Sequence, residues 1–276
     1  DPDSDINNYQ IQIIEPSAET PTISVYQPVP EAGVKGLGIG DIVMWFDALD
    51  RKTISSDREI KVYEWLDKSG FGRHATLNNQ PTTVNNPTYS TNDINGYPAI
   101  YFDGVNDYLK IDGSPFVDTD YSVFIVERRT TSDGQYRFMI GGGKNGKNKN
   151  LQIGYRYDEQ FSLDHHSNNL DVTIDGYTSE TKARFWNTTF SKTAGKKIYL
   201  DGDIIAQDES QTDALTAFEN AMLGKYKNSG HYQGYISEVI VFDKVLTEFE
   251  RNQVELYLKL KWEVGTPQYK LKLINL

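Results

Sequence analysis

The sequence predicts an antiparallel β-sandwich with a single helix near its C-terminus. Three observations lead to this fold class. Short β-rich runs recur along the chain, turn-forming Gly, Asn and Asp residues separate them, and no long helical patterns alternate with them. Alternating helices would indicate a parallel sheet, whereas many short strands joined by turns are typical of antiparallel sandwiches and barrels.

Each expected strand has a local signal. Apolar, β-branched or aromatic residues are concentrated in residues 42–46, 121–126, 151–157, 184–190 and 234–242. Residues 197–206 hold two further β-rich runs joined by Asp201 and Gly202. This dipeptide accepts the positive φ angles of a two-residue turn, so it predicts a β-hairpin.

The one expected helix begins after Thr247. Thr247 and Glu250 fit a capping box, in which each side chain binds a backbone amide near the helix start. Val254, Leu258 and Trp262 follow at a spacing of four residues, which places them on one helix face. Gly265 and Pro267 come just after the expected end. We expect this helix to pack on the sandwich without a chemical role.

Both ends of the chain have the features of extended arms. Five of the ten prolines fall in the first thirty residues, yet residues 9–13 alternate between polar and apolar, as a strand does. Residues 269–273 alternate in the same way. We therefore expect an arm or linker with one strand at 1–33, the sandwich domain at 34–264 and a strand or arm at 265–276. The arm strands pair with each other, extend the sandwich sheet, or pair with another subunit in a homo-oligomer or parent assembly.

Composition excludes several classes of partner and site. The chain has 28 Lys and Arg against 39 Asp and Glu, a formal charge of −11, which repels nucleic acid. It has no cysteine, which excludes disulfides and thiolate chemistry. No apolar run approaches the roughly 20 residues that span a bilayer, so we expect no membrane insertion. Because it starts at Asp1 without a signal peptide, we expect a processed form or a fragment.

Four segments give the chain a family resemblance. They are residues 44–50 (MWFDALD), 65–76 (WLDKSGFGRHAT), 95–108 (NGYPAIYFDGVNDY) and 238–242 (EVIVF). In this order and spacing they resemble the laminin-G-like, concanavalin-A-like lectin/glucanase superfamily, over roughly residues 40 to 262. The resemblance implies a two-sheet antiparallel jelly roll, of the kind that bacterial and viral surface proteins carry.

The resemblance also implies a function class, because such domains commonly bind glycans or proteins. Our first hypothesis is a non-catalytic carbohydrate- or surface-binding module, a lectin or adhesion domain, displayed outside the cell on a cell surface or virion. The first alternative is a structural subunit, such as a fibre or capsid-decorating protein, assembled through the arms. The second alternative is a polysaccharide-cleaving enzyme. A fold by itself does not decide among them.

Sugar binding needs an aromatic face for the sugar C–H groups and planar polar groups for its hydroxyls. Side chains of this kind occur in three parts of the sequence and could equally belong to the core. The candidates are Tyr155, Arg156, Tyr157, Trp186, His231 and Tyr232.

The candidate metal site is a loop with Asp103, Asn106 and Asp107, because calcium prefers many oxygen ligands. The resemblance implies that an acidic residue of this segment contributes to a calcium site in the family. It also implies a carboxylate in the last strand, where this chain has Ser237. The alternative interpretation is that these residues only form turns.

We assign no catalytic residue. Retaining glycoside hydrolysis needs two carboxylates roughly 5 Å apart, but Glu238 and Asp243 are five residues apart and on opposite faces of a strand. The strand motifs of alginate-lyase-like jelly rolls are also missing. Residues 141–147 match the G-x-x-x-x-G-K pattern, but Asn148 replaces the required Ser or Thr and no helix signal follows. This segment is therefore predicted to be a basic hairpin loop.

Overall fold

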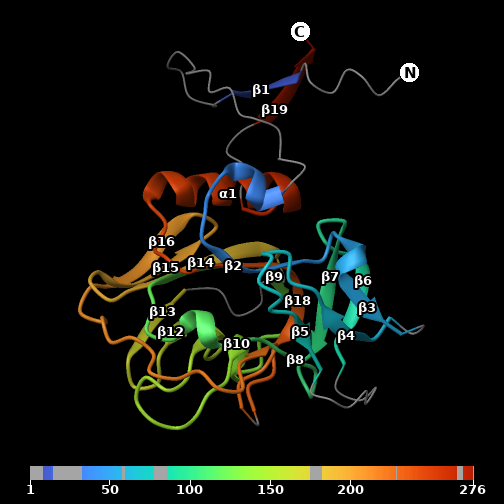
Figure 1. The fold of residues 1–276 in the computed structure, drawn as a ribbon. Helices are drawn as coiled ribbons and strands as arrows, with labels where there is room; N and C mark the ends of the chain where they lie inside the picture. The colour runs from blue at the N-terminus through green and yellow to red at the C-terminus, as the bar shows by residue number, and fades with distance from the viewer. Residues whose placement is uncertain are drawn as a thin grey trace.

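The computed structural model (Figure 1) describes residues 9–14, 33–57, 60–77, 86–174, 182–227, 229–265 and 270–275. Its body consists of two antiparallel sheets. The nine-stranded sheet has the order β13 (Asn169–Thr173), β12 (Gln160–Asp164), β11 (Gln152–Tyr155), β10 (Arg137–Gly141), β17 (Met222–Leu223), β8 (Leu109–Lys110), β5 (Ala75–Thr76), β4 (Val62–Trp65) and β3 (Ile54–Ser56).

The eight-stranded sheet has the order β16 (Asp203–Asp208), β15 (Gly195–Leu200), β14 (Arg184–Ser191), β9 (Tyr121–Arg129), β18 (Gln233–Phe242), β7 (Tyr97–Asp103) and β6 (Thr88–Ile94). Strand β2 (Ile42–Asp47) pairs with the C-terminal half of β18. Three short 3₁₀ helices, η2 (Gly33–Leu37), η3 (Arg51–Thr53) and η4 (Ser114–Phe116), lie in the connections. The predicted all-β sandwich is thus confirmed.

The main hydrophobic core lies between the two sheets. Alternate residues of each strand supply it, as the period of two in a β-strand requires. From β9 the inward residues are Tyr121, Val123 and Ile125, and from β12 they are Phe161 and Leu163. The ring of Phe161 stacks on Trp186 of the opposite sheet, with 3.6 Å between centroids.

The predicted hairpin and helix both form. Strands β15 and β16 are joined by Asp201 at φ 53° and Gly202 at φ 101°, the positive angles expected of a two-residue turn. Helix α1 (Glu248–Trp262) begins with Thr247 as its N-cap, and the capping box with Glu250 is complete.

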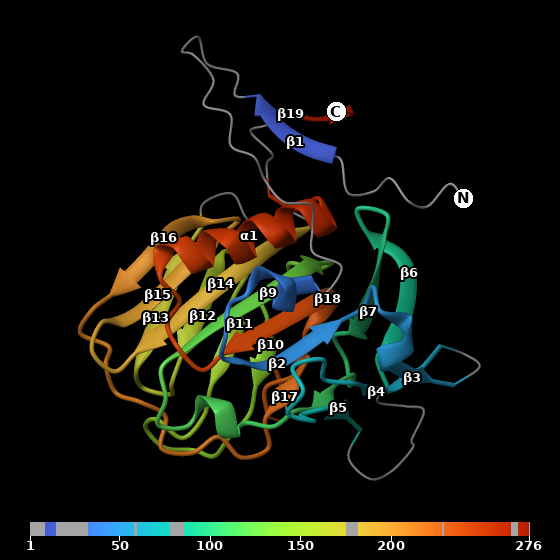
Figure 2. The same cartoon turned by 45° about the horizontal axis from the view of Figure 1, so that its top comes forward.

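Helix α1 covers the outer face of the eight-stranded sheet (Figure 2). A second hydrophobic core fills the space between them. It includes Val254, Leu258 and Trp262 from the predicted helix face, together with Phe124 and Ile240 from the central strands. The described residues include no helix that is long and apolar enough to cross a membrane.

A fully buried carboxylate, Glu238, connects helix α1 to the sheet. It accepts hydrogen bonds from Trp45 Nε1 at 2.7 Å, Tyr257 Oη at 2.8 Å and Trp262 Nε1 at 2.5 Å. Lys261 Nζ forms an ion pair with it at 3.0 Å. Burial raises the pKa of Glu238, and the charge of Lys261 opposes that rise.

A β-bulge makes this contact possible. The register of β18 against β9 shifts between Ile236 and Glu238, so Ser237 is the extra residue. As a result Ile236 and Val239 both face the inter-sheet core, while Glu238 between them faces the helix.

The strands of the two arms pair with each other. Strand β1 (Tyr9–Ile14) runs antiparallel to β19 (Lys270–Asn275), with Ile11 opposite Leu273. In Figures 1 and 2 this two-stranded ribbon lies outside the sandwich, on the side of helix α1. The remainder of the predicted N-terminal arm, including its prolines, lies outside the described residues.

We predict that Glu238→Ala lowers the free energy of unfolding by about 3–5 kcal/mol, because two indole N–H groups and the Tyr257 hydroxyl lose their buried acceptor, while Lys261 loses this ion pair and keeps the one with Asp47. Glu238→Gln should cost less, since its amide oxygen still accepts one of these hydrogen bonds. Urea denaturation measures both. The exposed Glu209→Ala is the control, with an expected change within about 0.5 kcal/mol. A loss below 1 kcal/mol for Glu238→Ala would contradict the assigned role.

Candidate functional site

Three of the six side chains predicted to bind a glycan are in the core instead. Tyr155, Trp186 and Tyr232 are at most 1% exposed, which corrects their assignment as ligand contacts. All three donate hydrogen bonds to the buried carboxylate of Glu127, at 2.7 Å from Tyr155 Oη, 3.0 Å from Trp186 Nε1 and 2.5 Å from Tyr232 Oη. The aromatic residues therefore surround a structural carboxylate, and no ligand reaches them in this conformation.

The other three candidates lie apart from one another. Arg156 forms ion pairs with Asp164 at 2.8 Å and Asp171 at 3.3 Å on the outer face of the nine-stranded sheet. Tyr157 is 49% exposed, and its ring packs against Tyr136 at 5.3 Å. His231 is half-buried, and burial together with the charge of Lys225 lowers its pKa. The structure does not bring the six residues together as one site.

The predicted calcium residues form a tight turn after β7. Asp103 Oδ1 accepts the backbone N–H groups of Val105, Asn106 and Asp107 at 2.8, 3.0 and 3.2 Å. Asp107 Oδ2 accepts the backbone N–H of Asp103 at 3.0 Å. Asn106 Oδ1 is buried and has no hydrogen-bond partner among the described residues. Within those residues, no group of three or more His, Asp or Glu side chains is placed to hold a metal ion.

Asp107 is nevertheless electrostatically unusual. It is only 2% exposed, and burial together with the nearby charge of Asp103 raises its pKa to about 7. The protonated carboxyl is therefore favoured in the fold over a pH range in which an ordinary Asp is ionised.

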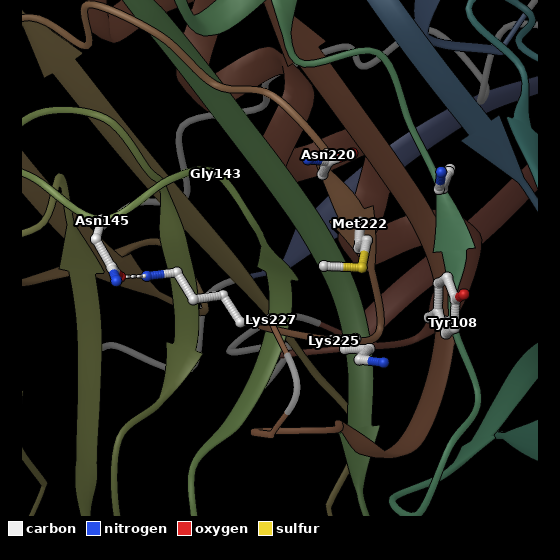
Figure 3. Close-up of a pocket in the computed structure, with 8 residues that line it drawn as sticks. Tyr108, Gly143, Asn145, Asn220, Met222, Lys225 and Lys227 are labelled. Atoms are coloured by element: carbon white, nitrogen blue, oxygen red, sulfur yellow. Dashed lines mark hydrogen bonds between the residues drawn. The ribbon is translucent and has the colours of Figure 1, made fainter. Parts of the chain in front are cut away.

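A pocket of about 430 Å³ lies on the outer face of the nine-stranded sheet (Figure 3). Three segments that are distant in the sequence enclose it: β8 with the residue before it, the β10–β11 loop, and the chain around β17. The lining residues are Tyr108, Lys110, Gly143, Asn145, Asn220, Met222, Lys225 and Lys227.

The β10–β11 loop is the basic hairpin that the sequence predicts at residues 141–147, and a polar network holds it in place. Asn150 Nδ2 donates to the backbone oxygen of Lys144 at 2.9 Å. Gln152 Nε2 donates to Asn150 Oδ1 and to Asp164 Oδ2, both at 3.0 Å. This network fixes the side of the pocket on which Asn145 lies.

The glycines at the base of this loop let other segments come close. A Cβ at Gly141 would lie 2.7 Å from the backbone oxygen of Lys225. A Cβ at Gly142 would clash with the backbone oxygen of Asn220, and one at Gly143 would clash with Asn150. The run Gly141-Gly142-Gly143 therefore allows close backbone packing around the pocket and does not bind a phosphate in the manner of a nucleotide-binding loop.

Two polar interactions orient side chains in the pocket. Lys227 Nζ donates to Asn145 Oδ1 at 2.6 Å, the dashed line in Figure 3. Lys225 Nζ lies 4.5 Å from the centroid of the Tyr108 ring, a cation–π distance. Sequence reasoning missed this site. No motif marks Lys225 or Asn220, and the available signals were the predicted basic hairpin at 141–147 and the polar position of Lys110 in a strand.

Sequence comparison identifies the family. The model of the concanavalin A-like lectin/glucanases superfamily matches residues 103–250, which include the turn after β7, the pocket and strand β18. The chain belongs to this superfamily. No curated protein sequence matches the chain.

Several solved structures share the superfamily fold. The ligand-binding domain of botulinum neurotoxin serotype D, in complex with N-acetylneuraminic acid, has a TM-score of 0.58 at 13% identity over 82% of this chain and 54% of its own. Domain 4 of an extracellular arabinanase from Geobacillus stearothermophilus, in complex with arabinotriose, has a TM-score of 0.55 at 14% identity. The match covers 78% of this chain and 98% of that domain.

A sialidase from Trypanosoma rangeli has a TM-score of 0.59 at 14% identity over 92% of this chain and 37% of its own. The chain thus spans about half of the toxin domain and about a third of the sialidase. Identities this low establish a shared fold and nothing further.

We predict that Asp107→Asn changes the pH dependence of stability. The raised pKa of Asp107 means that its contribution is fully present below pH 4 and is lost as the pH rises through about 7. The Asp107→Asn variant does not titrate at this position. In the presence of a chelator, the free energy of unfolding of the variant minus that of the original chain should therefore increase by about 2 kcal/mol between pH 5 and pH 8. The exposed Asp203→Asn is the control, for which we expect no such change.

The Asp107→Asn variant also tests calcium binding at this turn. We propose that Asp103, Asn106 and Asp107 bind calcium, with the unpartnered Asn106 Oδ1 as one ligand. An ion bound only by the folded state stabilises it by about 2.7 kcal/mol at a hundredfold excess over its Kd. Millimolar calcium should raise the Tm of the original chain and leave that of Asp107→Asn unchanged. An equal response in both proteins would contradict the site.

Proposed function

We propose that this protein is a non-catalytic carbohydrate-recognition module and that its ligand occupies the pocket on the outer face of the nine-stranded sheet. The observation that carries the proposal is the composition of that pocket. Tyr108 offers a ring for the C–H face of a sugar, while Asn145 and Asn220 offer amides for its hydroxyl groups.

The comparisons support this proposal at a coarse level. The toxin domain is described in complex with N-acetylneuraminic acid and the arabinanase domain with arabinotriose, so domains of this fold do hold carbohydrates. Neither ligand transfers to this chain by fold alone. We further propose an extracellular location, on a cell surface or a virion, where such a module meets its glycan.

The charged groups of the pocket favour binding over catalysis. Its lining contains no carboxylate and no histidine among the described residues, so it lacks the pair of carboxylates that glycoside hydrolysis uses. Glu127 and Glu238 are both fully buried in structural roles. A sialidase is among the similar structures, which is why product analysis belongs in the test.

A second candidate function is a structural subunit, favoured by the β1–β19 ribbon. A two-stranded sheet alone is marginally stable in water. In this ribbon, each strand has one edge that pairs with no other described strand. Such edges accept a strand from a neighbouring subunit, so the ribbon suits assembly.

Removal of residues 1–32 separates these roles. We expect the truncated chain to keep its Tm within a few degrees, because the described sandwich begins at η2 and the described core residues lie between Val34 and Val264. If the ribbon mediates assembly, the original chain is an oligomer by light scattering and the truncated chain is a monomer. Unfolding of the truncated chain, or a monomeric original chain, would contradict the assembly role.

Glycan binding is tested by array screening, followed by calorimetry on the best ligand. We predict that Tyr108→Ala and Asn220→Ala each weaken binding roughly tenfold, about 1.4 kcal/mol, through loss of ring stacking and of an amide hydrogen bond. Tyr157→Ala removes a half-exposed tyrosine that does not line the pocket and serves as the matched control. Loss of binding in the control alone would place the site elsewhere. Shortened oligosaccharide after long incubation would instead indicate an enzyme.

A further inference from the structure

The pocket differs in charge from the rest of the protein. Three of its eight lining residues are lysines, Lys110, Lys225 and Lys227, and none is acidic. The whole chain has the opposite balance, with 39 acidic and 28 basic residues. A local excess of positive charge on an acidic protein therefore coincides with the proposed binding site.

The lysines around the pocket fall into two groups. Two of those on the hairpin loop outside it are paired, Lys144 with Glu219 at 2.8 Å and Lys147 with Asp213 at 2.6 Å. Lys110, Lys225 and Lys227, by contrast, form no ion pair with any described residue. Two lysines beside the pocket thus have acidic partners within the fold, whereas the three pocket lysines have none in the described part of the chain.

Partial burial destabilises the charged form of Lys225 unless an anion lies beside it. Its ammonium group is held at 4.5 Å from the Tyr108 ring centroid, and partial burial lowers its pKa. Its charge also depresses the pKa of His231. An anion placed beside this group would restore the favourable environment that burial removes.

We infer that the pocket selects an acidic saccharide, whose carboxylate or sulfate group lies between Lys110 and Lys225 while a sugar ring contacts Tyr108. This inference rests on the proposed carbohydrate-binding function and adds the charge class of the ligand. Asn145 and Lys227, already joined by a hydrogen bond of 2.6 Å, then face the hydroxyl groups of the sugar. A long polyanion such as nucleic acid is disfavoured, because the chain as a whole has a formal charge of −11.

The test compares charged saccharides with matched neutral ones by calorimetry on the full chain. The pairs are trigalacturonate and its methyl ester, N-acetylneuraminyl-lactose and its methyl ester, and a sulfated galactan oligosaccharide and its desulfated form. We expect at least one charged member to bind tenfold or more tightly than its neutral partner, with an affinity that falls as salt rises. The identity of that member distinguishes a carboxylate ligand from a sulfate ligand.

Variants then assign the effect to the pocket. Lys110→Gln and Lys225→Gln should each weaken binding of the charged member about fivefold to tenfold and that of the neutral member about twofold or less. Lys52→Gln, an exposed lysine on η3, is the matched control and should bind normally. Thermal melts verify that each variant folds.

Two results would overturn the inference. Equal binding of charged and neutral members, or equal losses for both in the lysine variants, would refute charge selection and leave carbohydrate recognition standing. No binding of any saccharide would refute the proposed function together with the inference.

Discussion

Two neighbouring strands of the eight-stranded sheet, β9 and β18, each carry a fully buried carboxylate. The two carboxylates lie on opposite faces of that sheet, and the layers of the protein are organised around this pair. Glu127 on β9 faces the nine-stranded sheet, where two tyrosines and a tryptophan donate to it. Glu238 on β18 faces helix α1. A buried charge is stable only when its acceptor positions are filled, so each carboxylate requires its surrounding layer to dock in one orientation. Hydrophobic burial favours both interfaces, and the two carboxylates select their geometry.

The inner carboxylate is also connected to the proposed binding pocket. Tyr232, which donates to Glu127, follows directly on the segment that carries Lys225 and Lys227. The other end of that segment is held by Gly224, whose backbone N–H donates to the oxygen of Met139 at 2.7 Å and whose own oxygen accepts from Tyr232 at 2.8 Å. Lys225 and Lys227 therefore project from a short segment that is fixed at both ends, whereas Lys110 lies on β8. Pre-organisation of this kind reduces the entropy lost when a ligand binds.

Local sequence signals predicted the turn, the helix cap and the strands whose conformation is set by residues close together in the sequence. The Asp201-Gly202 turn, the capping box of Thr247 and Glu250, and the strand runs that became β2, β9, β14 and β18 all formed as expected. For Tyr155, Trp186 and Tyr232 the sequence left a glycan-binding role and a core role open, and the structure places all three in the core. An aromatic ring that stacks on a sugar and one that donates to a buried carboxylate have the same sequence pattern.

The sequence by itself thus determined the fold class, the hairpin, the helix and its cap, because each depends on φ, ψ preferences and periodicity over a few residues. Only the tertiary structure decided which residues share a site. The bulge at Ser237 turns Glu238 towards the helix, and it arises from pairing with β9 rather than from a local motif. The pocket joins Lys110, Asn145 and Lys225, which are far apart in the chain. Their proximity follows from strand order in the nine-stranded sheet, a long-range property that local propensities do not encode.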